Sequence, residues 1–539
     1  MSKLSKYASK EAGQMKEFYG AAVENFMGGT SFEVSPLQTL RIVAASSIFG
    51  EPQYYRDGLD SKKTISRGMS HREFEIFDSL ITDGKSAVDI FTSAIDNALS
   101  FDFKGTLDLA LELRTNYYMR LNPAVIYVRA IQHEGRAHFN EVMPGYMKRI
   151  GKAIALRPDD VTNQFEYFMF MNGSKKGMPS ILKRTWAETL ESFSRYQLNK
   201  YKGKNLIDLV RLSHANNADI DELMTTGTLK VADSEQTWET LKSAGNTWKD
   251  ILSTINMPHM ALLRNLRGIF TEINDKATAE KALTHLKNGV EKGKQFPFRY
   301  WSAHKAIQSA DVNHKGLILD ALEECMDIAV ANMPKLEGRV MSLCDNSGSA
   351  HGTLNSEYGS VTVSEIANLS ALITGMQSEE GHVGVFGDRL NTRGVSKRNG
   401  LLTQLAESNR IGNGIGGGTE NGIWLFWDKA IKNKEHWDTV FIYSDMQAGT
   451  GGLYGEHASD YRDFQWKDGR HIDVLALVNH YRKTVNPKVN VFSVQVAGYN
   501  NSVLPENLYR GALLAGWTGK EPVYAKAIID TWNQIESKK

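Results

Sequence analysis

The hydrophobic pattern of this chain changes near residue 336, and the change limits the folds that are open to it. Up to about residue 335, apolar residues recur at helical spacing, with few runs of alternating β-branched residues. Examples are the segments 106–119, 180–201, 205–213 and 260–270. Beyond that point, short apolar strands alternate with helical segments. We therefore predict an all-α part followed by an α/β part built on a doubly wound parallel sheet.

The α/β part contains four candidate strands and several candidate helices. The strands, each apolar and bounded by turn residues, are 339–344, 382–387, 439–444 and 489–496. Helices are expected at 422–431 and 473–484, and Thr362 and Glu365 have the spacing of a capping box that opens another. Ligands of such a sheet bind at the carboxyl ends of its strands.

Size and composition exclude several classes of protein. The chain has 539 residues, too many for one ordinary core, and its 41% hydrophobic and 23% charged residues are typical of a globular protein. We find no apolar run of about 18 residues and no apolar signal segment at the start, so we expect a cytoplasmic protein without a membrane span. Of the two cysteines, Cys325 and Cys344, the second lies in an apolar strand and is expected to be a small core residue.

The formal net charge of +1 excludes a globally basic nucleic-acid binder, but it does not describe how charges cluster. Between Lys175 and Arg211 there are nine basic and three acidic residues. This local excess of cations is a candidate contact for an anionic partner.

The stretch CDNSGSA at 344–350 follows a predicted strand and places Asp345, Ser347 and Ser349 at its carboxyl end. Mg²⁺ prefers near-octahedral oxygen ligands, and this loop offers two hydroxyls and a carboxylate that can hold a metal-bound water. Thr419 in the glycine-rich GIGGGTE and Asp445, directly after strand 439–444, are candidates for further oxygens. Taken singly, these stretches could equally be a turn and a flexible connector.

The ordered set Asp-x-Ser-x-Ser, Thr, Asp resembles the metal-ion-dependent adhesion site of von Willebrand factor A domains. The resemblance implies Ser347, Ser349 and Thr419 as hydroxyl ligands of a divalent ion, most simply Mg²⁺. It places Asp345 and Asp445 among or next to the ligands and leaves one position for a carboxylate of a partner.

Two other metal or phosphate motifs are not met. A Walker loop needs a lysine where Gly418 stands, and the histidines His133 and His138 are five residues apart instead of the four that a zinc-protease helix requires. We expect these two histidines to be surface or capping residues.

Four stretches of the helical part, at 40–55, 197–214, 257–270 and 297–304, together resemble the TROVE module of Ro autoantigen proteins. In that family the module is fused to a von Willebrand factor A domain. The resemblance implies an N-terminal extension (1–35), a TROVE ring of HEAT-like repeats (36–336) and an A domain with the metal site (337–539).

The same resemblance implies a monomeric RNA-binding ring for RNA quality control or processing. Small structured (Y-like) RNA would bind the outer face, single-stranded ends of misfolded RNA would enter the central hole, and an exoribonuclease would be a further partner. The RNA-contacting pattern of the family corresponds here to Lys200, Tyr201, Lys204, Arg211 and His214. Lys204 stands where the family has an arginine, and the connection to His214 is shorter, so this contact is expected to differ.

Interpretations of these residues that do not involve RNA also stay open. Lys200 to Lys204 could be a solvated helix end, and His214 could be only a helix cap. Arg264 and Arg267 in the segment 260–270 could line the hole or could pair with neighbouring acids.

No stretch of the chain assembles a nucleophile, a base and an oxyanion site, so we do not expect an enzyme. The alternative function is a metal-dependent adaptor whose A domain captures an acidic protein partner. A metal-dependent nuclease is a third hypothesis, disfavoured because two-metal nucleases need clustered carboxylates and the predicted ligand set is rich in hydroxyls.

Overall fold

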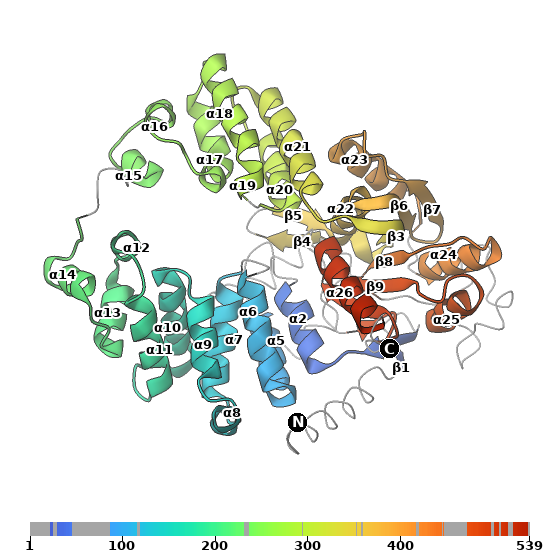
Figure 1. Cartoon of the computed structure of the whole chain (residues 1–539). Coiled ribbons are helices and arrows are strands. Elements are labelled where there is room, and N and C mark those ends of the chain that lie inside the picture. Colours follow the sequence, from blue (N-terminus) through green and yellow to red (C-terminus); the bar gives the residue numbers. More distant parts are fainter. Residues whose placement is uncertain are drawn as a thin grey trace. The chain divides into compact units, whose positions relative to one another are not determined.

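The computed structural model describes most of the chain (Figure 1). The described residues are 22–24, 30–45, 87–115, 119–230, 237–293, 295–351, 353–356, 359–416, 420–444, 446, 472–496, 501–505, 508–515 and 521–536. They form two compact units, divided between Leu241 and Lys242 within α15 (Trp238–Ser243). We call the one that contains α2 and α5 to α14 the helical unit, and the one that contains α16 to α26 and the strands the C-terminal unit.

The helical unit consists of helices joined by short connections. They are α2 (Pro36–Ala45), α5 (Ala87–Phe101), α6 (Phe103–Thr115), α7 (Leu121–Gln132), α8 (Arg136–Val142), α9 (Tyr146–Ile154), α10 (Pro158–Asn172), α11 (Ser180–Leu190), α12 (Arg195–Lys200), α13 (Lys204–Ser213) and α14 (Ala218–Thr226). The helices form two layers. In one layer α10 packs between α7 and α13, and in the other α9 packs between α6 and α11. Helices of the two layers pack on each other, as in helical repeats.

The predicted helix at 180–201 is wrong in its length, because the structure breaks it between Leu190 and Ser194. Ser194 caps a new helix: its Oγ accepts a hydrogen bond from the backbone N–H of Gln197 at 3.3 Å, and the Gln197 side chain accepts from the Ser194 N–H at 3.0 Å. This reciprocal capping box favours a helix start at Arg195 over a continuous helix.

A buried ion pair joins the two layers of the helical unit. Asp160 in the first turn of α10 is 2% exposed, and its Oδ2 lies 2.8 Å from Nη2 of Arg114 at the end of α6. The same carboxylate also accepts hydrogen bonds from Nε of Arg120 and from the backbone N–H groups of Leu156 and Arg157. Four donors therefore compensate for the burial of the Asp160 charge.

The C-terminal unit begins with helices and continues as an α/β domain. Its helices are α16 (Trp248–Thr254), α17 (His259–Glu272), α18 (Lys276–Asn288), α19 (Val290–Gly293), α20 (Pro297–Gln308), α21 (Lys315–Ala331), α22 (Val363–Met376), α23 (Leu401–Gly412), α24 (Glu420–Lys432), α25 (Val474–Thr484) and α26 (Glu521–Glu536). Its strands are β1 (Ala22–Glu24), β2 (Thr30–Glu33), β3 (Leu336–Asp345), β4 (Thr353–Ser356), β5 (Gly359–Thr362), β6 (Ser378–Phe386), β7 (Leu390–Gly394), β8 (Thr439–Ser444), β9 (Asn490–Gln495), β10 (Asn501–Ser502) and β11 (Gly511–Ala515).

Six strands form one twisted sheet in the order β11-β9-β8-β3-β6-β7. All neighbours are parallel except the edge strand β7, which is antiparallel to β6. Helices α22 and α26 contact strands on one face, while α24 and α25 bury Trp424, Trp427 and Tyr481 in an apolar core on the other. The predicted fold class, a helical-repeat part plus an α/β parallel sheet, is confirmed.

The four predicted strands correspond to β3, β6, β8 and β9, and the predicted capping box opens α22. The Glu365 N–H donates to Thr362 Oγ1 at 3.1 Å, and the Thr362 N–H donates to the Glu365 carboxylate at 3.5 Å. Strands β7 and β11 and the antiparallel pairs β1-β2, β2-β10 and β4-β5 were not predicted. No helix among the described residues is long and apolar enough to cross a membrane.

Candidate functional site

Asp345 is the last residue of the central strand β3, and its side chain is fully buried. One carboxylate oxygen accepts a hydrogen bond from the backbone N–H of Ser347 at 2.9 Å. The other accepts from the hydroxyl of Ser444, the last residue of β8, at 2.6 Å. The carboxyl ends of two adjacent strands are thus joined by one carboxylate at the edge of the sheet where parallel α/β folds bind ligands.

Only part of the predicted ligand set lies within the described residues. Asp345 and Ser347 are brought together and both are buried. Ser349 begins a short 3₁₀ turn, but its side chain lies outside the described residues, as do Thr419 and Asp445. Ser444, which precedes Asp445, was not predicted, although its place at the end of an apolar strand is a signal of the same kind.

The donor atoms at this edge suit a hard cation. In the described part of the chain, no group of three or more His, Cys, Asp or Glu side chains could hold a metal ion. The neighbouring Cys344 thiol faces the carbonyl of Gly384 at 3.6 Å, and burial raises its pKa, so it stays a neutral thiol. The oxygen atoms of Asp345, Ser347 and Ser444 are the ligand type that Mg²⁺ prefers, whereas softer transition metals prefer nitrogen or sulfur ligands.

A chain of buried amides holds the residue next to Asp345. The Asn346 side chain donates to Oδ1 of Asn368 on α22 at 2.8 Å and accepts from its amide at 2.9 Å. Asn368 also donates to Asn409 on α23 at 2.8 Å. Gly412 lies so close that an added Cβ would be 2.0 Å from Oδ1 of Asn346. The loop after β3 is thereby fixed to two helices.

The predicted RNA-contacting residues fall at opposite ends of α13. Lys200 ends α12, with Nζ 3.3 Å from a carboxylate oxygen of Glu239 and about equally far from the Tyr196 and Tyr201 rings. Burial lowers the pKa of Lys200, but the charge of Glu239 and the nearby tyrosines raise it, and the net shift is upward. Arg157 donates to the Tyr201 hydroxyl at 3.3 Å. These side chains form one partly covered cluster.

Arg211 follows Lys204 by seven positions on α13, which is about 10 Å along the helix axis. Arg211 and His214 are exposed, and Arg211 has no acidic partner among the described residues. His214 is the C-cap of α13 with φ of 59°, so it does have the capping position. Lys204 begins α13, and its side chain lies outside the described residues.

Arg264 and Arg267 lie three residues apart on α17, and both side chains are exposed. Within the ranges that the structure describes, neither forms an ion pair. The alternative in which they pair with neighbouring acids is therefore not observed among these residues.

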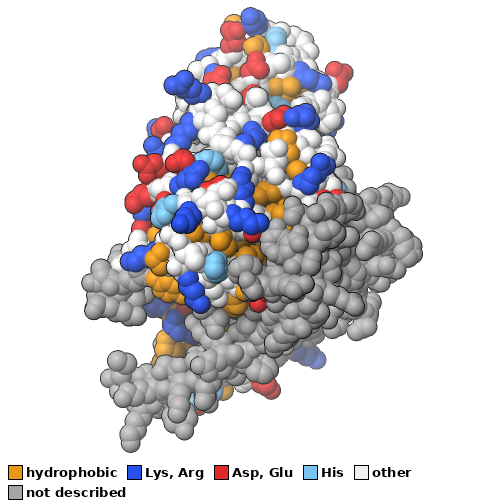
Figure 2. Space-filling model, turned by 90° about the vertical axis from the view of Figure 1, so that its right-hand side faces the viewer, with side chains coloured by type: hydrophobic (Ala, Val, Ile, Leu, Met, Phe, Trp, Pro, Cys, Tyr) orange, Lys and Arg blue, Asp and Glu red, His pale blue; other side chains and the backbone are white. Residues whose placement is uncertain are grey.

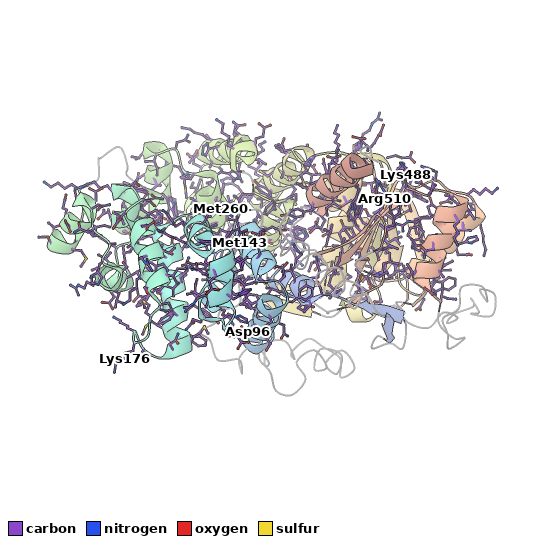
Figure 3. All side chains as sticks on the ribbon, turned by 60° about the horizontal axis from the view of Figure 1, so that its bottom comes forward. Asp96, Met143, Lys176, Met260, Lys488 and Arg510 are labelled. Carbon is purple, nitrogen blue, oxygen red and sulfur yellow. The ribbon has the colours of Figure 1, made fainter. Side chains whose placement is uncertain are left out.

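The local excess of basic residues between 175 and 211 is partly neutralised in the folded chain. Ion pairs join Lys175 to Asp208, Arg195 to both Asp219 and Glu222, and Lys200 to Glu239. Lys176 lies in the connection between α10 and α11 and points away from the helices (Figure 3). Basic and acidic side chains are also interspersed over the face shown in Figure 2, in keeping with the low net charge.

The histidines of HEGRAH lie at the surface end of α7 and on α8. Nδ1 of His133, the C-cap of α7, accepts a hydrogen bond from the Gly135 N–H at 3.1 Å, and His138 is exposed. Both have the surface or capping positions that we predicted.

Comparison with known proteins completes this description. Residues 224–326, which run from the end of α14 into α21, match the TROVE domain family. The crystal structure of the Ro (RSR) protein of Deinococcus radiodurans is similar to the chain with a TM-score of 0.55, and the match covers 81% of this chain and 92% of that one. The chain thus contains a segment that matches the TROVE domain, and it has the fold of a bacterial Ro protein.

The two proteins share 14% sequence identity, so the structural match shows the fold alone. No curated protein sequence matches the chain significantly. Arg264 and Arg267 lie inside the matched segment, whereas Lys200, Tyr201 and Arg211 precede it.

Proposed function

We propose that this protein binds RNA in the manner of Ro proteins. It would hold small structured, Y-like RNA and single-stranded ends of misfolded RNA, for RNA quality control or processing, without catalysing a reaction itself. The observation that carries the proposal is the TROVE match over 224–326 on a chain with the Ro fold. The exposed charges of Arg264 and Arg267 within that segment support it, because phosphates attract arginines whatever the RNA sequence.

Binding of RNA to the purified protein tests the proposal directly. We expect a fluorescently labelled RNA hairpin and a labelled single-stranded oligonucleotide both to bind, with affinities that fall steeply as salt rises, because phosphate contacts release counterions. Binding should survive EDTA, since the contacts are to lysine and arginine. Failure to bind either RNA at low salt would refute the proposal.

Replacing Arg264 and Arg267 together by glutamine is expected to weaken RNA binding. Loss of two phosphate contacts should flatten the slope of log affinity against log salt by about 1.5–2. Anisotropy titrations at several salt concentrations measure this slope. The matched control is the double lysine variant, which keeps both charges and should retain most of the slope. A glutamine variant with an unchanged slope would remove these residues from the interface.

The alternative function, a metal-dependent adaptor for an acidic protein partner, is favoured by the position of Asp345 at the carboxyl end of β3. Asp345, Ser347 and Ser349, with Thr419 and Asp445, would hold the divalent ion, which would supply a Lewis-acidic position for a carboxylate of the partner. Chelation and high salt distinguish the two functions. Chelation would release a protein partner and leave RNA bound, whereas high salt would release RNA first.

A further inference from the structure

The side of α9 opposite its buried residues is the most consistently basic helix face in the described part of the helical unit. Its sequence, YMKRIGKAI, contains three cations and no acid. Tyr146, Met147, Ile150 and Ile154 are buried, so Lys148, Arg149 and Lys152 necessarily lie on the other side. Because α9 packs between α6 and α11, this side is continuous with theirs.

On the α6 side, two cations lie near one ring. The Arg149 guanidinium is 4.4 Å from the centre of the Tyr146 ring, and Lys104 Nζ is 5.3 Å from it. Lys104 also bonds to Asp108 at 2.5 Å, and the Tyr146 hydroxyl donates to the same carboxylate. Asp108 thus offsets one of two neighbouring positive charges.

On the α11 side, one acid serves two lysines. Lys148 and Lys152 both bond to Glu188, the second at 3.3 Å, and the hydrogen bond from Lys148 is the main cause of the lowered pKa of Glu188. Arg184 lies one turn before Glu188 on the same face of α11 and is exposed. Ion pairs at such exposed positions contribute little to stability, so these cations can be shared with a ligand.

We define the α9 basic face by the residues in these contacts together with Arg184, which is placed by its position on α11. They are Lys104, Asp108, Lys148, Arg149, Lys152, Arg184 and Glu188. Five cations face two carboxylates across three helices, and packed helices lie about 8–10 Å apart, so the charges extend over roughly 20 Å.

We propose that the α9 basic face docks the phosphate backbone of helical RNA. The inference rests on the proposed RNA-binding function and names a surface for it that is separate from Lys200, Arg211, Arg264 and Arg267. Duplex RNA is recognised mostly through its shape and its phosphates, which point charges spread over a helical surface can contact. Binding of single strands relies on exposed aromatic rings, and the ring at this face, Tyr146, is buried.

The test compares a triple variant with a matched control. Lys148→Gln, Arg149→Gln and Lys152→Gln together remove three positive charges of the face. Arg398→Gln, Lys483→Gln and Lys488→Gln remove the same number and kinds from exposed positions on the α/β domain. We expect the first variant to bind an RNA hairpin about tenfold or more weakly at low salt, with a salt slope smaller by about 2–3. The control variant should bind the hairpin normally, and both should bind oligo(U) normally.

A second variant guards against an effect of misfolding. Glu188→Gln removes a carboxylate from the same face, so it should tighten hairpin binding by about two- to fivefold, which a damaged fold would not do. Normal hairpin affinity and slope in the triple variant, or equal weakening in the two triple variants, would overturn the inference and leave the proposed function intact. If the unaltered protein binds neither RNA, the proposed function itself fails, and the inference with it.

Discussion

Replacing Asp160 by alanine is expected to destabilise the helical unit by about 3–5 kcal/mol, because it leaves the buried Arg114 charge without its partner. Arg114 is 6% exposed and, among the described residues, would keep only its bond to the Ile154 carbonyl, while two backbone N–H groups would lose their acceptor. The melting temperature of this unit should fall by about 10 °C or more. Thermal unfolding followed by circular dichroism measures the change, and hydrogen exchange in α6, α9 and α10 locates it.

The adjacent carboxylate gives the control. Asp159 pairs with Arg120 and Arg157 but is 25% exposed on its side chain, so Asp159→Ala should cost about 1 kcal/mol or less. Equal destabilisation by the two variants would mean that burial of Asp160 is not the reason for its effect.

Replacing Asp345 by alanine is expected to abolish binding of a divalent ion to the C-terminal unit. The carboxylate is the one charged oxygen donor that the described residues place beside Ser347 and Ser444. Its loss also leaves the buried Ser347 N–H and Ser444 hydroxyl without their acceptor, which should destabilise this unit by about 1–3 kcal/mol. Calorimetric titration with Mn²⁺ or Mg²⁺ measures the first effect, and thermal unfolding measures the second.

Two further variants separate the loss of ion binding from the loss of stability. Asp438→Ala removes a carboxylate before the amino end of β8, where it accepts from the Arg339 N–H at 2.7 Å, and should leave ion binding unchanged. Asp345→Asn keeps an acceptor for the Ser347 N–H, so it should restore most of the stability but not the ion. Undiminished ion binding by Asp345→Ala would falsify the assigned ligand set.

Much of the α/β fold could be predicted because its signals are local. The strand at 439–444 has the predicted bounds, and the capping box at Thr362 opens a helix as predicted, since both depend on a few neighbouring residues. The edge strand β7 was missed because its sequence, LNTRG, is not apolar, and only pairing with β6 makes it a strand. The two-residue strand β10 likewise exists through its pairing with β2.

Part of the candidate metal site could also be predicted from the sequence. Asp345 follows an apolar strand, and in parallel sheets such residues meet at one edge whatever the rest of the chain does. Ser444 also ends an apolar strand, but its specific role, the bond to Asp345, depends on a contact with a residue 99 positions away. The amide chain from Asn346 through Asn368 to Asn409 joins three segments and leaves no periodic signal in any of them.

The sequence by itself determined the helical and α/β parts, most strand positions and the loop that carries Asp345, because side-chain periodicity and capping act over a few residues. Only the tertiary structure decided that Asp160 neutralises Arg114 across 46 residues and that Glu239 pairs with Lys200. It also decided that cations from α6, α9 and α11 share one face. These features depend on distances between segments, which hydrophobic patterning does not encode.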